Sequence, residues 1–386
     1  MTIAVYASDL APLADGVQLK RVQDIAYNAT LNTEALREFA NAGVTEYKDD
    51  VPKVATNLTM NEFDGSLDLD RALFNKSSGS ITLPTDALAS LPCVDFMAPI
   101  RWDGTFSETD WISRVFIERY SLDFDVNGYI RSTYTGTGDL LTYWLGASKT
   151  AKIAIGTYAT ASTFTVLGDI SGKTALKARV NEKIVPAASI TIGTFADGKT
   201  TVTLASPYNN LVTSDRIRLI YNDTAYTFPA LSTAGIGGLR RGCVDLYLYK
   251  AGTGENSWLR LQRATIDVPL GTADLVQLGS KYPVTKKLTI PFNLTLTATA
   301  ARNDLTDFAI FAEKTDPTEM SLEDLVRTAH FKAKIYDSDV NRTNLLKVIS
   351  IEDLKVTGVD HRGTVGDAPL DVGYTLQADN IVISAT

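Results

Sequence analysis

Residues 114–128 read RVFIERYSLDFDVNG, and this stretch decides the fold class. Its apolar side chains Tyr120, Leu122, Phe124 and Val126 alternate with polar ones, as in a β-strand that buries one face. The Asn-Gly pair that follows is typical of a tight type I′ hairpin turn. The sequence therefore predicts a long strand that ends in a turn and pairs with the residues after it.

The same period-two alternation recurs along the chain, in segments rich in Thr, Val, Ile and Tyr. A mainly β protein is therefore predicted. The clearest of these segments are 54–60, 244–249, 288–290, 293–297 and 381–383.

Two short helices are also predicted. Asn32 is placed to cap a helix over residues 33–41, and Gly43 follows where a helix commonly ends. Ser321 and Asp324 are close to a capping box, which predicts a second helix that carries His330 near its C-terminal end. His330 is expected to be a surface or partly buried helix residue with no catalytic role.

A shift in composition marks an insertion. From Ser148 to about Gly235 the chain is rich in Ala, Thr, Ser, Ile and Val, with turn signals at the spacing of a small β-sandwich. The flexible segment 234–238 follows it. We therefore expect an inserted Ig-like β-sandwich over 148–235, flanked by residues 1–147 and 236–386 as two parts of one discontinuous domain.

Composition excludes several classes of protein. The 386 residues are 45% hydrophobic and 21% charged, as in folded globular proteins, and the net charge of −8 argues against nucleic-acid binding as the main task. The uninterrupted apolar stretches are too short for a membrane helix, and the start does not resemble a signal peptide. We expect a non-exported protein that does not insert into membranes.

The sequence contains few of the residues that catalytic and metal-binding sites use. The two histidines, His330 and His361, are too few for a histidine-rich metal cluster, and Cys93 and Cys243 lie 150 residues apart without a CxxC motif. We predict that both thiols are buried, and whether they pair is open. The glycine-rich segments complete no phosphate-binding motif. We expect no enzyme and no cofactor.

Residues 123–128 read DFDVNG and match the first half of a calcium-binding loop. The second half fails, because the ninth position is Arg131 and the twelfth is Tyr134, where a bidentate Glu is required. A hairpin with Asn127 and Gly128 at its turn accounts for the whole run, so no metal site is predicted.

The order of these elements resembles the tail tube proteins of tailed bacteriophages. The resemblance rests on LNTEALREF at 31–39, on EYKDDVP at 46–52 with the strand after it, and on 114–128 continuing to the Gly-Asp pair at 138–139. It implies two packed antiparallel sheets with a flanking short helix. It also implies a structural virion protein, the major tail protein, whose hexameric rings stack into the tube through which the genome is ejected.

The resemblance further implies partners and a location. The partners would be further copies of the chain and other tail proteins, such as the tape measure, initiator and terminator proteins. DNA would pass through transiently without specific binding, and the location would be the virion tail, assembled in the host cytoplasm. A closed ring would also pair the exposed edges that long strands leave.

Two groups of residues are candidates for these contacts. The mixed-charge loop from Glu46 to Lys53 is a candidate contact between rings, equally well an ordinary exposed loop, and its candidate residues are Glu46, Tyr47, Lys48, Asp49 and Asp50. Asp123 and Asp125 lie on the strand face opposite Leu122 and Phe124, which makes them candidates for the lumen or an interface. The hairpin candidates are Asn127 and Gly128. Carboxylates in a lumen would repel DNA phosphates.

A different class of function stays open. A carbohydrate- or receptor-binding virion component, or one that decorates a capsid, would use residues 148–235 as its binding part. This segment contains no Trp to stack on a sugar ring, which lowers that alternative. A hydrolase that uses paired carboxylates ranks last.

Overall fold

A computed structural model of the chain describes residues 11–19, 22–30, 33–36, 46–49, 53–61, 67–74, 76, 78–102, 105–125, 127–181, 183–228, 239, 241–250, 261–275, 285–301, 329–337, 342, 344–362 and 371–385. The prediction of a mainly β protein is confirmed, since strands make up most of the described residues. The body, formed by the segments before and after the insertion, carries sixteen strands in one hydrogen-bonded network.

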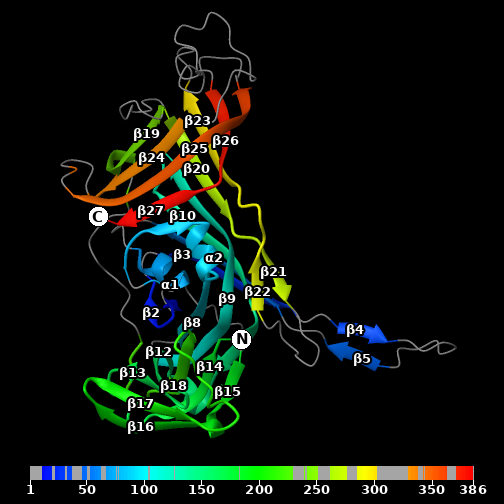
Figure 1. The fold of residues 1–386 in the computed structure, drawn as a ribbon, viewed down its shortest axis with the longest axis vertical. Coiled ribbons are helices and arrows are strands. Elements are labelled where there is room, and N and C mark those ends of the chain that lie inside the picture. The colour runs from blue at the N-terminus through cyan, green and yellow to red at the C-terminus, as the bar shows by residue number, and fades with distance from the viewer. Residues whose placement is uncertain are drawn as a thin grey trace, which may run out of the picture.

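The first layer of the body is a broad antiparallel sheet (Figure 1). The long strand β9 lies at its centre, between β10 and β20 in one half and beside β8 and β11 in the other. The order across the sheet is β25-β26-β23-β20-β9-β10-β6-β3, and β1 and β2 join it through β8. The bounds are β1 Leu13–Ala14, β2 Val17–Gln18, β3 Val22–Thr30, β6 Lys53–Asn61, β8 Cys93–Trp102, β9 Thr105–Asp125, β10 Arg131–Gly138, β11 Leu140–Trp144, β20 Leu261–Pro269, β23 Leu294–Ala301, β25 Leu345–Arg362 and β26 Asp371–Ala378.

The second layer has the order β19-β24-β25-β27-β7, and β25 links it to the first. Residues before Lys355 in β25 pair with β24 and β27, whereas those from Lys355 onward pair with β26. Apolar side chains of both layers pack into one core cluster, with Phe331 and Ile349 from the second layer and Leu122 and Leu296 from the first. The bounds are β7 Ile81–Leu83, β19 Val244–Lys250, β24 Ala329–Tyr336 and β27 Ile381–Ala385.

The inserted segment forms a seven-stranded antiparallel sheet with its own core, which we call the module (green in Figure 1). The sheet is continuous, in the order β15-β14-β18-β12-β13-β17-β16, and β12 pairs with both β13 and β18. Its two halves contribute to the same apolar cluster, as in a sandwich whose layers share one strand. The bounds are β12 Ala151–Thr160, β13 Thr163–Leu167, β14 Thr174–Val180, β15 Lys183–Pro186, β16 Ile190–Ala196, β17 Lys199–Leu204 and β18 Ile217–Asn222.

Gly156 lies where β12 passes from one half of the module to the other. A Cβ atom at this position would lie 2.6 Å from the Phe164 ring and 2.7 Å from Ile217. Only glycine lets the strand approach these buried side chains so closely.

The expected C-terminal junction of the insertion, residues 234–238, lies outside the described residues.

Both helix predictions need correction where the structure describes the residues. Residues Thr33–Leu36 form strand β4, which pairs with β5 (Glu46–Asp49), and the rest of the expected helix lies outside the described residues. His330 lies on β24, where its ring stacks on Tyr249 at 5.4 Å between centroids. The start of that expected helix, from Ser321, is also outside the described residues.

The helices that the structure does describe are short and lie elsewhere. The described α-helices are α1 (Asp68–Leu73), which contacts β8, and α2 (Thr85–Ala89), which contacts β7. A further hairpin of the body joins β21 (Thr272–Leu275) to β22 (Thr285–Leu288). Cys93 and Cys243 are buried, as expected, and the question of pairing is answered by both thiols being free.

The hairpin after β9 is present, but its turn is shifted from the predicted one. The Gly128 amide donates to the Asp125 carbonyl oxygen at 3.2 Å, so the turn runs from Asp125 to Gly128. Gly128 does not adopt the positive φ that a type I′ turn at Asn127-Gly128 requires. The Asp125 carboxylate accepts a hydrogen bond from the Asn127 amide at 2.7 Å, and this side-chain cap explains the shift.

Candidate functional site

The exposed face of the first layer is polar and rich in threonine. Period-two alternation turns one side of each strand to the core, so the opposite sides form one continuous surface across the sheet. We call this surface the threonine face. Its residues are Lys53, Ala55, Asn57, Thr59, Arg119, Ser121, Asp123, Asp125, Arg131, Thr133, Thr135, Thr137, Arg263, Thr265, Asp267, Thr295, Thr297, Thr299, Lys355, Thr357, Gly373, Thr375 and Gln377, all exposed or partly exposed.

Strand register places these side chains in rows across the sheet. In one row Thr375 lies opposite Thr297, Thr297 opposite Thr265, and Thr265 opposite Asp123. Hydroxyl groups connect neighbours in other rows, as between Thr59 and Thr133 at 3.3 Å. Such cross-strand pairs stabilise a sheet without any partner on its outer side. The face therefore needs no outer partner to be stable, although the β21–β22 hairpin contacts it at one end, where Lys286 donates to Thr137 at 2.8 Å and Asp274 lies 3.9 Å from Lys53.

The charges on the threonine face are paired across strands. Arg263 donates from Nε and Nη2 to the two carboxylate oxygens of Asp123 at 3.1 Å each, and Thr265 donates to the same carboxylate at 2.8 Å. Arg119 and Asp267 pair at 2.5 Å. These hydrogen bonds to carboxylates raise the pKa of Arg119 and of Arg263. Paired in this way, these two arginines present little uncompensated charge to a polyanion.

The hairpin candidates lie where the alternation predicted. Asp123 and Asp125 are partly exposed, opposite in direction to buried Leu122 and Phe124. Their environment differs from the expected acidic lining, because Arg263 neutralises Asp123 and Asp125 caps the turn. Asn127 and Gly128 form that turn.

Strand β3 is one edge of the first layer, since within the described part of the chain it pairs with β6 alone. Its side chains alternate between partly buried and exposed, with Gln23, Asp24, Ala26 and Asn28 exposed. An edge of this kind carries backbone donors and acceptors that another chain can pair with.

A partly buried hydrogen bond fixes this edge strand to the centre of the sheet. The Tyr27 hydroxyl donates to Oδ2 of Asp110 on β9 at 2.5 Å. Burial raises the pKa of Asp110 to about 6, against the lowering effect of the Tyr27 hydrogen bond. Burial and the Asp110 carboxylate raise the pKa of Tyr27 as well. The edge is therefore held in position before any partner binds.

The inter-ring candidates fall on a hairpin that extends away from the body (blue, at the right of Figure 1). Residues Glu46, Tyr47, Lys48 and Asp49 make up β5, which pairs with β4 so that Tyr47 lies opposite Ala35. The expected loop is thus a strand over these four residues. Asp50 lies outside the described residues.

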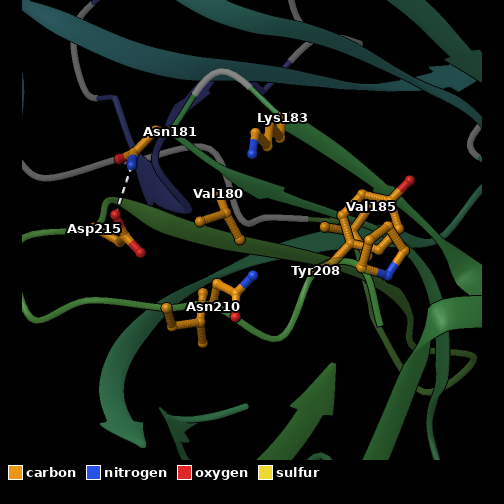
Figure 2. A pocket seen from close by; sticks show the side chains of 9 residues that line it. Val180, Asn181, Lys183, Val185, Tyr208, Asn210 and Asp215 are labelled. Atoms are coloured by element: carbon orange, nitrogen blue, oxygen red, sulfur yellow. Dashed lines mark hydrogen bonds between the residues drawn. The ribbon is translucent and has the colours of Figure 1, made fainter. Parts of the chain in front are cut away.

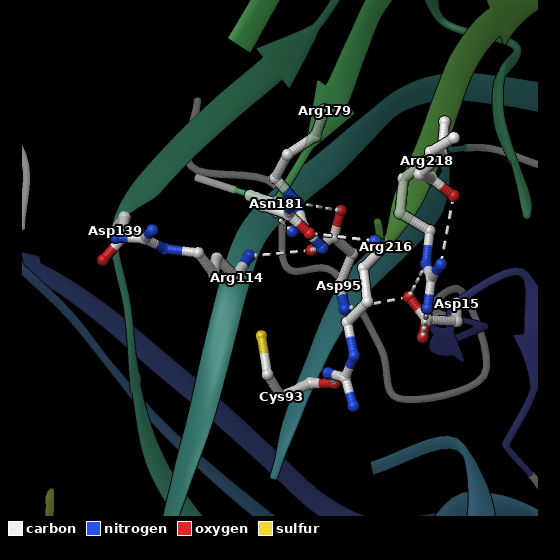
Figure 3. Close-up of polar contacts among 10 residues, drawn as sticks. Asp15, Cys93, Asp95, Arg114, Asp139, Arg179, Asn181, Arg216 and Arg218 are labelled. Atoms are coloured by element: carbon white, nitrogen blue, oxygen red, sulfur yellow. Dashed lines mark hydrogen bonds and ion pairs between the residues drawn. The ribbon is translucent and has the colours of Figure 1, made fainter. Parts of the chain in front are cut away.

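Sequence reasoning missed an ion-pair cluster that joins the module to the body (Figure 3). Arg179 on β14 donates to the Asp95 carboxylate on β8 at 2.5 and 3.1 Å. Arg218 on β18 donates to Asp15 of the β1–β2 turn at 2.6 and 2.8 Å. All four side chains are at most 5% exposed.

A third arginine of the module reaches the body without a carboxylate partner. Arg216 donates to the carbonyl oxygens of Cys93 and Leu73 and to the Ser90 hydroxyl, at 3.0, 3.3 and 2.6 Å. Burial lowers the pKa of Arg216, whereas for Arg179 and Arg218 the adjacent carboxylates outweigh burial and raise it. The module supplies the cations of this cluster and the body supplies the anions.

Apolar contacts surround the ion-pair cluster. Leu13, Met97 and Trp111 of the body pack with Ala151, Ile153 and Ile220 of the module in a separate buried cluster. Trp111 stacks on Trp144 at 6.3 Å between centroids, and the Lys177 ammonium lies over both rings. Buried aromatic and apolar contact of this kind makes the module part of one packed structure with the body.

The described residues form no metal-binding cluster. Among them, no three His, Cys, Asp or Glu side chains are grouped so that they could hold a metal ion. None of the described helices has the length and apolar character needed to cross a membrane.

Comparison with known proteins gives a partial likeness to solved structures alone. No family model matches the chain, and no curated protein matches it. Among solved structures, part of the chain is similar to the cryo-EM structure of the anti-feeding prophage cap, the tube-terminating cap, with a TM-score of 0.28 and 10% sequence identity over 43% of this chain and 97% of that chain.

Proposed function

We propose that the chain is a structural, non-catalytic virion protein of a phage tail, and that it assembles with copies of itself into stacked hexameric rings that form the tail tube. The threonine face lines the channel of this tube. In this arrangement tape measure, initiator and terminator proteins contact the ends or interior of the tube, and DNA passes along it without specific binding.

The character of the threonine face is the observation that carries this proposal. A channel for DNA needs a wetted wall without clusters of unpaired cations, because such clusters would hold phosphates and stop the DNA. Hydroxyl groups are the most frequent polar groups of the face, and the arginines Arg119 and Arg263 are paired with carboxylates. The open edge at β3 supplies a surface by which one copy adds to the next.

Two measurements on the purified full chain test the proposal. Negative-stain microscopy is expected to show six-fold rings or hollow polymers. In addition, Thr297→Cys is expected to react with a maleimide carrying a large polyethylene glycol in the monomer but not in the polymer, since the reagent cannot enter a channel. The native thiols are buried and do not compete.

The control for labelling is Thr203→Cys, which places a thiol at an exposed position of the module. It should react in both states. Polymers in which the Thr297→Cys and Thr203→Cys variants are labelled equally would contradict the assignment of the lumen. Compact trimers without polymers would favour the second candidate, a receptor-binding or decorating virion component.

A further inference from the structure

A pocket of about 360 Å³ opens in the module between the β14–β15 hairpin and the segment that joins β17 to β18 (Figure 2). Its apolar interior is formed by Val185 and Leu211, which are 0% and 4% exposed. This volume lies at the lower end of the range for pockets that bind small molecules. The pocket borders the ion-pair cluster, because the backbone carbonyl oxygen of Asn181 in its lining accepts a hydrogen bond from Arg179 at 2.7 Å. Its lining shares no residue with the threonine face.

Hydrogen bonds hold the walls of the pocket in place without a ligand. The Asn181 amide nitrogen donates to Asp215 Oδ1 at 2.6 Å, and the Val212 amide donates to Oδ2 of the same carboxylate at 2.8 Å. The Asn181 side-chain oxygen accepts from the Arg216 amide at 2.9 Å. In the segment that joins β17 to β18, the backbone amide of Leu211 donates to the carbonyl oxygen of Ala161 at 2.8 Å. A preformed pocket loses little entropy when a ligand binds.

Polar groups stand around the apolar interior from different sides. Figure 2 shows Lys183 and Asn210 across the pocket from each other, with Asp215 on a third side and Tyr208 beside Val185. Lys183 and Asn210 are exposed, so their ammonium and amide groups are accessible. Asp215 already accepts two hydrogen bonds, but a carboxylate has about four lone-pair sites and can accept more.

This combination selects the class of ligand. A hydrophobic molecule would displace water from the exposed Asn210 amide and Lys183 ammonium without replacing their hydrogen bonds, which is unfavourable. An anion would be repelled by Asp215 and a cation by Lys183. A neutral sugar ring satisfies both parts, because its C–H groups pack on Tyr208 and the apolar interior while its hydroxyl groups donate to Asp215 and accept from Asn210 and Lys183.

We propose that this pocket binds a neutral hexose unit of a glycan. The inference does not depend on the assignment of the tail tube, since it concerns the module alone. A glycan bound here would give a tube subunit, or any other assembly of this chain, a contact with a carbohydrate surface.

The test uses methyl-selective NMR spectra of the full chain, in which the methyl groups of Val185 and Leu211 report on the pocket directly. The probes are the methyl glycosides of glucose, galactose, mannose and N-acetylglucosamine. At least one is expected to give saturable shifts of these methyl signals. Asn210→Ala should weaken binding tenfold or more, with the remaining methyl spectrum unchanged.

The matched control is Asn209→Ala, which alters the neighbouring residue outside the pocket lining and should bind as the wild type does. The proposal is overturned if none of the four glycosides gives saturable shifts. Equal affinities of the Asn210→Ala variant and the wild type would overturn it too. Shifts produced by inorganic phosphate or sulfate but by no glycoside would replace the sugar with an anion.

Discussion

Arg179 of the module and Asp95 of the body form a bidentate ion pair with both side chains almost fully buried, 84 residues apart in the sequence. The same carboxylate also accepts a hydrogen bond from the Arg114 amide at 2.8 Å. Asp95 therefore joins three segments of the chain at one point. Neither the body nor the module can satisfy this set of polar groups alone.

Removing the cation of this pair should be strongly destabilising. We expect Arg179→Met to lower the free energy of unfolding by about 3–5 kcal/mol, because it leaves the Asp95 carboxylate buried without its cation. Chemical denaturation measures the change. The matched control is Arg263→Met, which breaks an exposed pair with Asp123 and should cost less than about 1 kcal/mol. Equal effects of the two substitutions would contradict the structural role of the cluster.

Deleting residues 148–235 tests the junction between body and module. Joining the ends through a short Gly-Ser linker would leave Asp15 and Asp95 without Arg218 and Arg179, and would expose Trp111 and Met97. We expect the shortened chain to aggregate. A soluble, cooperatively unfolding product, as judged by size-exclusion chromatography and thermal denaturation, would show that the body folds independently.

Asp110 should make stability depend on pH. Its pKa of about 6 in the folded chain lies above the ordinary value of 3.8, mainly because of burial, so the folded state binds the proton more tightly than the unfolded state does. The stabilisation that the Asp110 proton gives to the folded state is fully present below about pH 4 and is lost as the pH rises through about 6. We expect the difference in unfolding free energy between wild type and Asp110→Asn to fall over this interval in urea titrations. A difference that does not vary with pH would contradict the effect.

Charges placed on the open edge should block assembly but not folding. Ala26 and Asn28 are exposed on β3, so the double substitution Ala26→Lys/Asn28→Lys should leave the monomer folded while preventing another chain from pairing there. Microscopy and light scattering are expected to find monomers only. The control is Thr203→Lys on β17 of the module, which should assemble normally. Normal polymers from the β3 variant would exclude this edge from the contact between copies.

Tyr47 lies on the β4–β5 hairpin, which extends away from the body. Because tyrosine is a common anchor in protein interfaces, we expect Tyr47→Ala to reduce the length and yield of polymers. The melting temperature of the monomer should stay unchanged. Tyr143→Ala is the control, since Tyr143 is 57% exposed on β11 of the body. Electron microscopy measures the lengths. Tubes of normal length from the Tyr47 variant would count against a contact between rings.

The fold class could be predicted because period two is a local property. Leu122 and Phe124 are buried and Asp123 faces outward, as the sequence alone requires of a half-buried strand. Local sequence signals did not predict the structure where strand pairing with distant residues decides it. The capping residue Asn32 predicted a helix, but residues from Thr33 pair with β5, and His330 lies on a strand between two others.

The ion-pair cluster had no signal in the sequence. Asp15 and Arg218 are 203 residues apart, and each looks like an ordinary surface residue until the fold buries both. The threonine face was only partly visible, because alternation predicts which side chains point outward but not which arginine lies opposite which carboxylate. That pairing depends on strand register, which is set by long-range contacts.

The shared strand β25 has a mechanical consequence for the body. Its 18 residues run from one layer into the other, so the two layers cannot slide along each other without breaking hydrogen bonds on both. A load applied to the threonine face would pass through this covalent backbone to the layer behind it. Tension would therefore be resisted by the full thickness of the body.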